Sequence, residues 1–301
     1  MLDLRKLRLL SELARRDTIA EVARTVGYSS SAVSQSLSQL EAEVGVQLLE
    51  RDGRRVRLTP AARSLVGRVD RVLAELDAAE VELASEQQTV RGEVVIGSFP
   101  SAAAGLVVPA LADLTHRYPD VACSVREHEP ADGIALLRSG VLDVLVSESY
   151  RGLAPRSTGG LVSQLLLEEP LRLLLPAAHA RPRRSVRLSD LREAAWISGL
   201  AATPFATAVE RACRLAGFTP RIAHRADDAV LIHALVAAGA GVALLPALAC
   251  REVDAVRIAS VSPDPPRRRI SALVRRGADR RPSVAATLGA LERQAARLTG
   301  A

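Results

Sequence analysis

The first sixty residues place apolar and polar positions in an order that predicts three short helices. Leucine and alanine recur at helical spacing over residues 3–15, with charged side chains between them. Thr18 begins a capping-box pattern ahead of a short second helix, which Gly27 ends. Ser29 is placed to cap a third helix over residues 30–43, whose apolar residues again share one side. Two helices joined by a turn of about three residues are typical of a helix-turn-helix.

The outer face of the third predicted helix consists of small, hydrogen-bonding side chains. Reading a DNA major groove requires such a face, and a glutamine can bind adenine through two hydrogen bonds. A serine-rich face taken alone is more typical of a solvated surface, but the helix pair in front of it favours contact with DNA. The candidate DNA-contacting residues on this helix are Ser30, Ser31, Ser34, Gln35 and Ser38.

A small basic hairpin, or wing, is predicted to follow Gly45. Asp52-Gly53 is a strong hairpin-turn dipeptide, and it lies between two short segments of strand character. Arginines on this wing would contact DNA phosphates, which set register and salt dependence without reading the sequence. The alternative is a solvated hairpin. The candidate phosphate contacts are Arg51, Arg54, Arg55 and Arg57.

Thr59-Pro60 begins a longer helix whose apolar residues repeat at alternating intervals of three and four. We expect this heptad seam to pair with a second copy, giving a homodimer or homotetramer and a pseudo-palindromic DNA target. Packing of part of the seam against the chain's own first helix is the competing interpretation. The candidate dimerisation residues are Leu65, Val69, Val72, Leu76, Ala79 and Leu83.

From Glu93 onward strand and helix patterns alternate, which predicts a parallel α/β fold. Strands are expected near 94–98, 121–127, 142–147, 171–175, 195–197, 220–225, 242–245 and 267–276. Helices are expected near 102–117, 131–138, 204–216, 229–238 and 282–298. The run from Ala229 to Cys250 approaches a bilayer-spanning length, but its glycines and Pro246 favour a buried helix, a turn and a short strand.

Charge and chemistry narrow the function classes. Residues 1–90 carry thirteen basic and fourteen acidic side chains, whereas residues 91–301 carry 27 and 20, a net +7. Three distant cysteines fit neither a disulfide framework nor a zinc site, and no export signal is apparent, so a cytoplasmic location is expected. No catalytic, metal or cofactor motif is found. His233 is expected to be a hydrogen-bonded core residue, and a thiol sensor among the cysteines stays open.

These features together resemble the LysR-type transcriptional regulators. The resemblance rests on Ala23, on SSSAVSQSLSQLEAEVGVQLLER from Ser29 to Arg51, and on RRVRLTPAA from Arg54 to Ala62. The family often has proline, arginine, phenylalanine and glycine at four positions where this chain has Ser31, Gln35, Leu49 and Ala62. These departures affect the particular operator contacts and leave the motif in place.

The resemblance implies a winged helix-turn-helix over residues 1–58, a linker and dimerisation helix over 59–89, and a two-lobed effector-binding domain over 90–301. This last domain would resemble periplasmic binding proteins, with lobe I over 91–161 and 267–301 and lobe II over 162–266. Promoter DNA and a small-molecule effector are the implied partners, and RNA polymerase is a further candidate.

Candidate effector contacts follow from strand ends and helix N-termini, where ligands of such folds sit. Each of them has a plain loop or capping role as its alternative. Helix N-termini and the net +7 favour a small anionic effector, whereas the arginine runs 181–187 and 267–269 are expected on the surface. The candidate residues are Ser98, Pro100, Ser101, His128, Glu129, Ser147, Ser198 and Thr203.

Two other functions are weighed against a sequence-specific regulator. The first is a sequence-tolerant nucleoid protein with vestigial sensor lobes. The second is a solute-binding or enzymatic α/β protein that carries an accessory DNA-binding domain.

Overall fold

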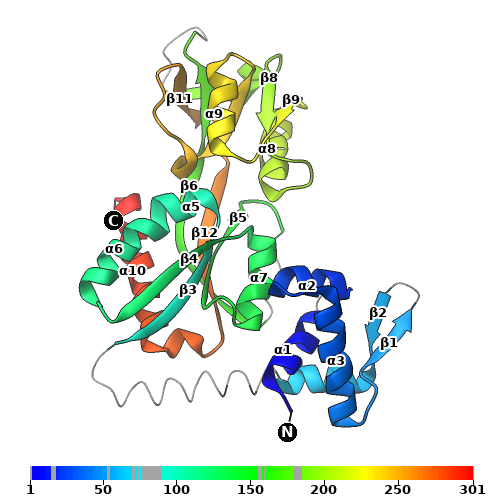
Figure 1. Cartoon of the computed structure of the whole chain (residues 1–301). Helices are drawn as coiled ribbons and strands as arrows, with labels where there is room; N and C mark the ends of the chain where they lie inside the picture. The colour runs from blue at the N-terminus through cyan, green and yellow to red at the C-terminus, as the bar shows by residue number, and fades with distance from the viewer. Residues whose placement is uncertain are drawn as a thin grey trace.

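The computed structural model describes residues 2–14, 18–52, 55–69, 72, 75, 90–154, 158, 160–178 and 185–300. Its N-terminal part contains α1 (Leu4–Leu13), α2 (Ile19–Val26) and α3 (Ser30–Val44), then the hairpin strands β1 (Leu49–Asp52) and β2 (Arg55–Leu58). Residues 60–69 continue as a helix. Figure 1 shows this part in blue, beside the larger α/β part of the chain.

The local signals in the sequence explain where these helices begin and end. Thr18 caps α2 by accepting a hydrogen bond from the amide of Glu21, and Ser29 caps α3 through the amide of Ala32. Gly27 ends α2 with a φ of +72°, a left-handed conformation that costs glycine little. The predicted helix-turn-helix is therefore present, and its helices share one hydrophobic core.

The first half of the α/β part alternates parallel strands with helices, as predicted. It contains β3 (Gly92–Ser98), α5 (Pro100–Ala102), η1 (Ala103–Val107), α6 (Val108–Arg117), β4 (Val121–Glu127), α7 (Pro130–Ser139) and β5 (Val144–Tyr150). Strand β3 pairs in parallel with both β4 and β5.

The second half begins with β6 (Leu161–Pro176), a strand of 16 residues that passes from one lobe into the other. The elements after it are β7 (Ser185–Arg187), η2 (Leu188–Leu191), β8 (Ala195–Ser198), α8 (Pro204–Leu215), β9 (Arg221–Arg225), α9 (Ala229–Ala237), β10 (Val242–Pro246) and η3 (Ala247–Ala249). The last elements are β11 (Val256–Ser262), β12 (Arg267–Arg275), η4 (Ala278–Arg280) and α10 (Pro282–Thr299).

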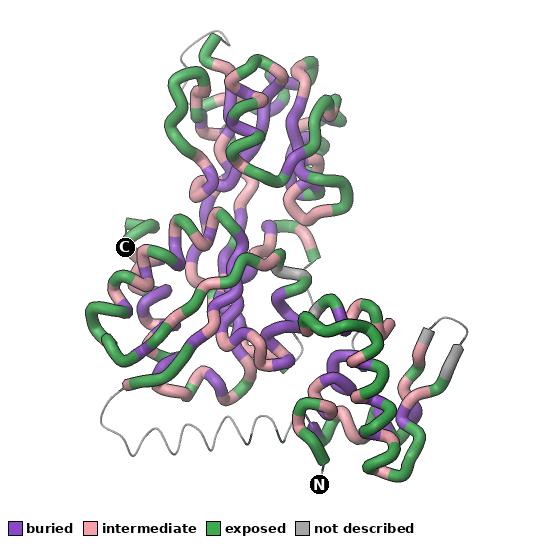
Figure 2. The backbone as a smooth tube through the Cα atoms, in the orientation of Figure 1, coloured by how far each residue is buried: buried purple, intermediate pink, exposed green. Residues whose placement is uncertain are grey.

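Hydrogen-bonded pairing joins the strands in the order β4-β3-β5-β12-β6-β10-β8-β9, with β11 also on β6. Strands β6 and β12 run along the narrow connection between the lobes in Figure 1. One lobe buries a core between its sheet and the helices α6 and α10, and the other has a separate core around Trp196. Figure 2 shows buried backbone inside each lobe and exposed backbone around it. The fold is therefore a winged helix-turn-helix followed by a two-lobed α/β domain.

The apolar run from Ala229 to Cys250 forms α9, β10 and η3, in agreement with the buried helix and strand expected from its glycines. Among the described residues, no helix combines the length and the apolar character needed to span a bilayer.

The helix-turn-helix lies against the first lobe through α7, which contacts both α1 and α2. Gly140 ends α7 with a positive φ, and a Cβ placed there would lie 3.2 Å from a guanidinium nitrogen of Arg8 in α1. Helix α7 therefore touches the DNA-binding helices at its C-terminal end.

Candidate DNA and effector sites

The outward face of α3 is formed by the side chains that the sequence predicts. Val33, Leu37 and Leu40 are buried in the core of the helix-turn-helix. The opposite side presents exposed residues, which include all five predicted contacts and also Gln39: Ser30, Ser31, Ser34, Gln35, Ser38 and Gln39. Gln39 was not among the predicted contacts, although its position four residues after Gln35 places it on the same face.

One side chain joins the wing to α3, and another joins the two ends of the wing. The Glu41 carboxylate accepts hydrogen bonds from the amides of Leu48 (2.8 Å) and Leu49 (2.9 Å), where the hairpin begins. The Thr59 hydroxyl donates to the carbonyl of Gln47 at 3.0 Å, where the hairpin ends. The hairpin is thus anchored to α3 at its start and closed at its base.

Of the four wing arginines, Arg57 has a described side chain, and this side chain is exposed on β2. The side chains of Arg51 and Arg55 lie outside the description, as does the whole of Arg54. Strand pairing sets Glu50 opposite Arg57 and Asp52 opposite Arg55.

The heptad seam divides into two parts. Val69 is buried in the core of the DNA-binding helices, and Leu65 is partly buried against it. Val72 is 47% exposed. Leu76, Ala79 and Leu83 lie outside the described residues. The beginning of the seam thus packs against the chain's own helices, as the competing interpretation holds.

The predicted effector residues of the first lobe lie on or just after three neighbouring strands. Ser98 ends β3, and the helix that follows begins with Pro100 and Ser101. His128 and Glu129 follow β4, whose last residue pairs with Ser98, while Ser147 lies within β5. In the second lobe, Ser198 ends β8 and Thr203 caps α8.

The hydroxyl groups of these residues differ in whether the protein already provides them with a hydrogen-bond partner. Thr203 accepts from the amide of Ala206 and donates to the carbonyl of Leu200, so a helix cap explains it. The Ser98 hydroxyl is turned to the carbonyl of Phe99. The Ser198 hydroxyl is completely buried and has no hydrogen-bond partner among the described residues. An unsatisfied buried hydroxyl is costly, which makes Ser198 the strongest ligand-binding candidate of this group.

Arg268 corrects the expectation that the run 267–269 lies on the surface. Its residue is only 3% exposed, whereas the neighbouring Arg269 is exposed. Side chains alternate along a strand, so the middle arginine of the run points inward while its neighbours point outward. The sequence pattern did contain this alternation, but it did not show which face of β12 is buried.

Arg268 is the centre of a buried ionic cluster between the lobes. Its guanidinium donates to Glu169 at 2.6 and 2.8 Å, to Glu148 at 3.1 Å and to the hydroxyl of Ser101 at 3.1 Å. It also lies over the ring of Phe99, 5.0 Å from the centroid. The cluster therefore engages Ser101, a predicted effector contact, through a residue that the sequence did not single out.

The same cluster connects to the second lobe. The other carboxylate oxygen of Glu169 accepts a hydrogen bond of 2.7 Å from the amide of Leu248, the middle residue of η3. A Cβ at Gly105, in the first lobe, would lie 2.9 Å from the Leu248 side chain. Leu248 of η3 thus contacts the first lobe at Gly105 and is hydrogen-bonded to Glu169 of the cluster.

The cluster is acidic in balance, with one guanidinium and two carboxylates. Burial alone would lower the pKa of Arg268, but the nearby negative charges of Glu169 and Glu148 raise it above its ordinary value. Burial, followed by the charge of Glu148, raises the pKa of Tyr150, whose hydroxyl donates to Glu148. Arg268 therefore stays charged and Tyr150 stays neutral.

The described residues show neither a metal-binding cluster nor a functional role for His233. Within the described part of the chain, no three histidine, cysteine, aspartate or glutamate side chains gather as a metal site requires. His233 is buried, and its ring is hydrogen-bonded to the carbonyl of Ala229 and to the amide of Arg251, which confirms the core role predicted for it.

Both parts of the chain match models of known protein families. Residues 4–63 match the profile described as "Bacterial regulatory helix-turn-helix protein, lysR family". Residues 87–296 match the profile of the "LysR substrate binding domain".

Curated relatives and solved structures agree with these matches. The transcriptional dual regulator GltC of Bacillus subtilis is 29% identical over 81% of this chain and 81% of its own. A probable hydrogen peroxide-inducible genes activator of Streptomyces viridosporus is 32% identical over 92% of this chain and 89% of its own. A full-length variant of OxyR from Pseudomonas aeruginosa has the same fold, with a TM-score of 0.68 at 20% identity over 97% and 98% of the two chains. CbnR in complex with its target DNA gives a TM-score of 0.58 at 23% identity over 97% and 99%.

Proposed function

The chain belongs to the LysR family of bacterial transcriptional regulators, and we propose that it reads a specific operator with α3 and senses a small anion between its lobes. The family assignment makes it a DNA-binding transcriptional regulator with an effector-binding domain rather than an enzyme. We propose the boundaries 1–58, 59–89 and 90–301 for its DNA-binding, linker and effector domains.

The exposed face of α3 is the main support for the proposal that the chain reads DNA bases. Gln35 and Gln39 each have a side-chain amide that can form two hydrogen bonds with adenine. The exposed serines on the same face of α3 are small, so the helix can approach the floor of the major groove. The wing arginines supply phosphate contacts, which hold the register but distinguish no bases. Specificity is thus assigned to α3, and general affinity to the wing.

The buried Ser198 hydroxyl supports an effector site between the lobes. A ligand there would satisfy this hydroxyl, and the N-termini of α8 and of the helix after Ser98 favour negative charge. An anion that reaches Ser101 would also meet the guanidinium of Arg268, in competition with Glu148. Effector binding would then alter the ionic cluster that joins the lobes, which gives the ligand a way to favour one lobe arrangement.

The proposed assembly is a homodimer or homotetramer held partly by the later residues of the heptad seam. The exposed Val72 supports this, since an apolar side chain at a seam position is available to a second copy. Two copies would deliver two α3 helices to the half-sites of one operator. Contact with RNA polymerase is proposed on family membership alone.

Peroxide is a poor candidate for the signal, although several relatives are named for induction by it. A thiol that reacts with peroxide needs a lowered pKa. Burial raises the pKa of Cys213 and of Cys250 to about 12, and it raises that of Cys123 as well. These thiols are therefore proposed as small apolar residues, and the signal as a metabolite that binds without covalent chemistry.

The decisive experiment compares the affinity of the purified chain for DNA upstream of its own gene and for random duplex of the same length, at one salt concentration. A specific regulator is expected to prefer one fragment by about a thousandfold or more. A ratio near one would favour the sequence-tolerant nucleoid protein. Turnover of a metabolite by the purified chain would instead support the enzymatic alternative.

Two variants test the assigned roles. Gln35→Ala is expected to relax preference at one base position of the operator, because it removes a base contact. Arg55→Ala is expected to weaken all duplexes alike and to lower the salt slope by about one. Equal loss of base preference in both variants would contradict the division of roles between α3 and the wing.

A further inference from the structure

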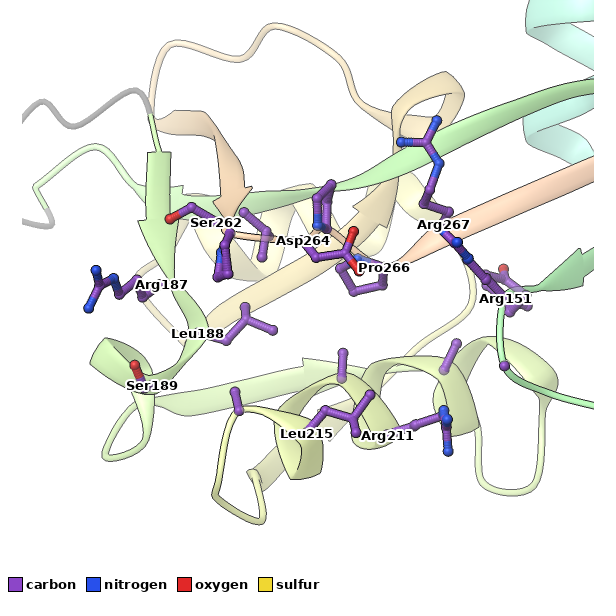
Figure 3. A pocket seen from close by; sticks show the side chains of 18 residues that line it. Arg151, Arg187, Leu188, Ser189, Arg211, Leu215, Ser262, Asp264, Pro266 and Arg267 are labelled. Atoms are coloured by element: carbon purple, nitrogen blue, oxygen red, sulfur yellow. The ribbon is translucent and has the colours of Figure 1, made fainter.

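A cavity of about 530 Å³ lies apart from the predicted effector residues and includes none of them. It is bounded by α8, by η2, by the segment 261–267 that joins β11 to β12, and by the end of β5 (Figure 3). The volume falls in the range of small-molecule sites. Because its walls come from the second lobe and from the strands that connect the lobes, a ligand there would contact the connection itself.

Most of the wall is apolar. Leu188, Ala208, Ala212 and Val261 line the cavity and belong to the core around Trp196. Leu215 lines it as well but is 75% exposed, an unusual position for a leucine on a helix with a packed inner face. Prolines of the segment 261–267 complete this side. Such a wall favours the apolar body of a ligand over a bare inorganic ion.

Positive charge gathers at one end. Arg151 and Arg267 are joined through their backbones, since the amide of Arg151 donates to the carbonyl of Arg267 at 3.0 Å. A Cβ at Gly152 would lie 3.0 Å from Nε of Arg211, so the Arg211 guanidinium covers the backbone next to Arg151. Figure 3 shows these three arginines at the same end of the cavity.

The arginines differ in their partners. Arg267 is ion-paired with Glu168. Among the described residues, neither Arg151 nor Arg211 has an ion pair. Arg187, at the other end, extends away from the cavity in Figure 3. Among the described lining residues, Asp264 is the one carboxylate, so a positive charge remains after Arg267 is discounted.

We propose that this cavity binds a small monocarboxylate with an apolar body, independently of the ligand between the lobes. Its carboxylate is held by Arg151 and Arg211, and its body lies along Leu188 and Leu215. Guanidinium groups bind carboxylates through paired, charge-assisted hydrogen bonds, and an apolar wall beside them excludes competing water.

Tyr150 connects this cavity to the ionic cluster around Arg268. Tyr150 lines the cavity, and its hydroxyl donates to Glu148, which in turn accepts from Arg268. Arg151 directly follows β5, and Arg267 opens β12, a strand of the connection between the lobes. A bound carboxylate would therefore bias the same connection that the effector between the lobes acts on.

Calorimetric titration of the full chain tests the site, with benzoate as probe and benzamide as its uncharged counterpart. We expect saturable benzoate binding at or below about 1 mM, and binding of benzamide at least about tenfold weaker, because the amide offers no charge to the arginines. Arg211→Gln and Arg151→Gln should each weaken benzoate about tenfold. Arg187→Gln is the matched control: it removes the same charge from the same lining and should leave the benzoate affinity within about twofold.

Specific outcomes would overturn the proposal. One is the absence of saturable benzoate binding up to about 10 mM. Another is equal weakening by Arg211→Gln and Arg187→Gln in variants with unchanged melting temperatures. A third is loss of benzoate binding in Ser198→Ala but not in Arg211→Gln, which would place the anion between the lobes. Operator binding without benzoate is measured in parallel, so a failure of this site is distinguishable from a failure of the DNA-binding function.

Discussion

The alternation of side chains along β12 determines which arginine is buried at the connection between the lobes. Arg267, Arg268 and Arg269 are identical in type, yet only Arg268 is buried, because consecutive side chains of β12 point to opposite faces. Its two carboxylate partners, Glu148 and Glu169, satisfy the guanidinium and are themselves satisfied by Tyr150 and by the amide of Leu248. A buried charge of this kind tolerates no loss of a partner.

Arg268→Met tests this arrangement. The substitution keeps an apolar stem of similar length but leaves two carboxylates buried without their cation, so we expect a loss of about 3–5 kcal/mol in the free energy of unfolding. Arg269→Met is the matched control, because the exposed Arg269 should contribute about 1 kcal/mol or less. Urea denaturation followed by circular dichroism measures both. Similar urea midpoints for the two variants would show that the buried cluster contributes no more than a surface pair.

The thiols provide a pH-dependent prediction. The pKa of Cys213 is raised to about 12 by burial, above the value of about 8.5 expected in the unfolded chain. The neutral thiol thus contributes stability that is complete below pH 8.5 and declines as the pH rises toward 12.

At pH 8 we therefore expect iodoacetamide to alkylate Cys213 at least about a hundredfold more slowly in the folded protein than in urea. Peptide mass spectrometry measures the two rates on the same residue, so the unfolded chain is its own control. Comparable rates in both states would indicate an accessible thiolate and would return the thiol sensor to consideration.

At the scale of the element, most helices and strands could be predicted from capping residues and from the periodicity of apolar residues. Thr18, Gly27 and Ser29 act as the sequence indicates, and the predicted helices and strands of the α/β part, β6 excepted, are present within a few residues. Local patterns of this kind depend on neighbours three or four positions away, and the sequence displays those neighbours directly.

Elements whose environment comes from distant residues were not predictable in this way. The sequence indicated a strand near 171–175, whereas β6 begins at Leu161, because its first half is stabilised by pairing with β12. The burial of Arg268 depends on Glu169, 99 residues earlier, and on Glu148, 120 residues earlier. The arginine-lined cavity likewise combines segments that no local pattern brings together.

Helix α7 offers a test of packing between an element and the sheet. A Cβ at Gly133 would lie 2.4 Å from Cδ1 of Leu145 in β5, so Gly133→Ala must displace the helix or the leucine. We expect it to cost about 1–3 kcal/mol of stability. Gly67→Ala is the matched control: Gly67 is also helical but has open space around its Cβ position, and alanine there should stabilise by about 1 kcal/mol. Thermal melts that shift in the same direction would contradict the close approach of α7 to β5.

At the scale of the whole molecule, α7 lies between the predicted effector residues and the helix-turn-helix. Its N-cap is Glu129, a predicted effector contact, and its C-cap Gly140 lies against Arg8 of the DNA-binding helices. A helix of ten residues that moves as one body would carry a change at the effector side to α1 and α2. Any such coupling is reciprocal, so operator DNA must change effector affinity by the same factor as the effector changes DNA affinity.

Assembly is the last requirement of the proposal, because one α3 would contact only half of a two-fold operator. Val69 is buried in the chain's own core, so the proposed dimer contact is assigned to the later seam positions. Val72→Asp places a charge at an apolar seam position that is 47% exposed in one chain, and it should convert the dimer to monomer and abolish binding to a full operator. Sedimentation velocity measures the change. Glu75→Ala, on the same helix but off the seam, should stay dimeric; a dimeric Val72→Asp would instead assign self-association to the effector domain.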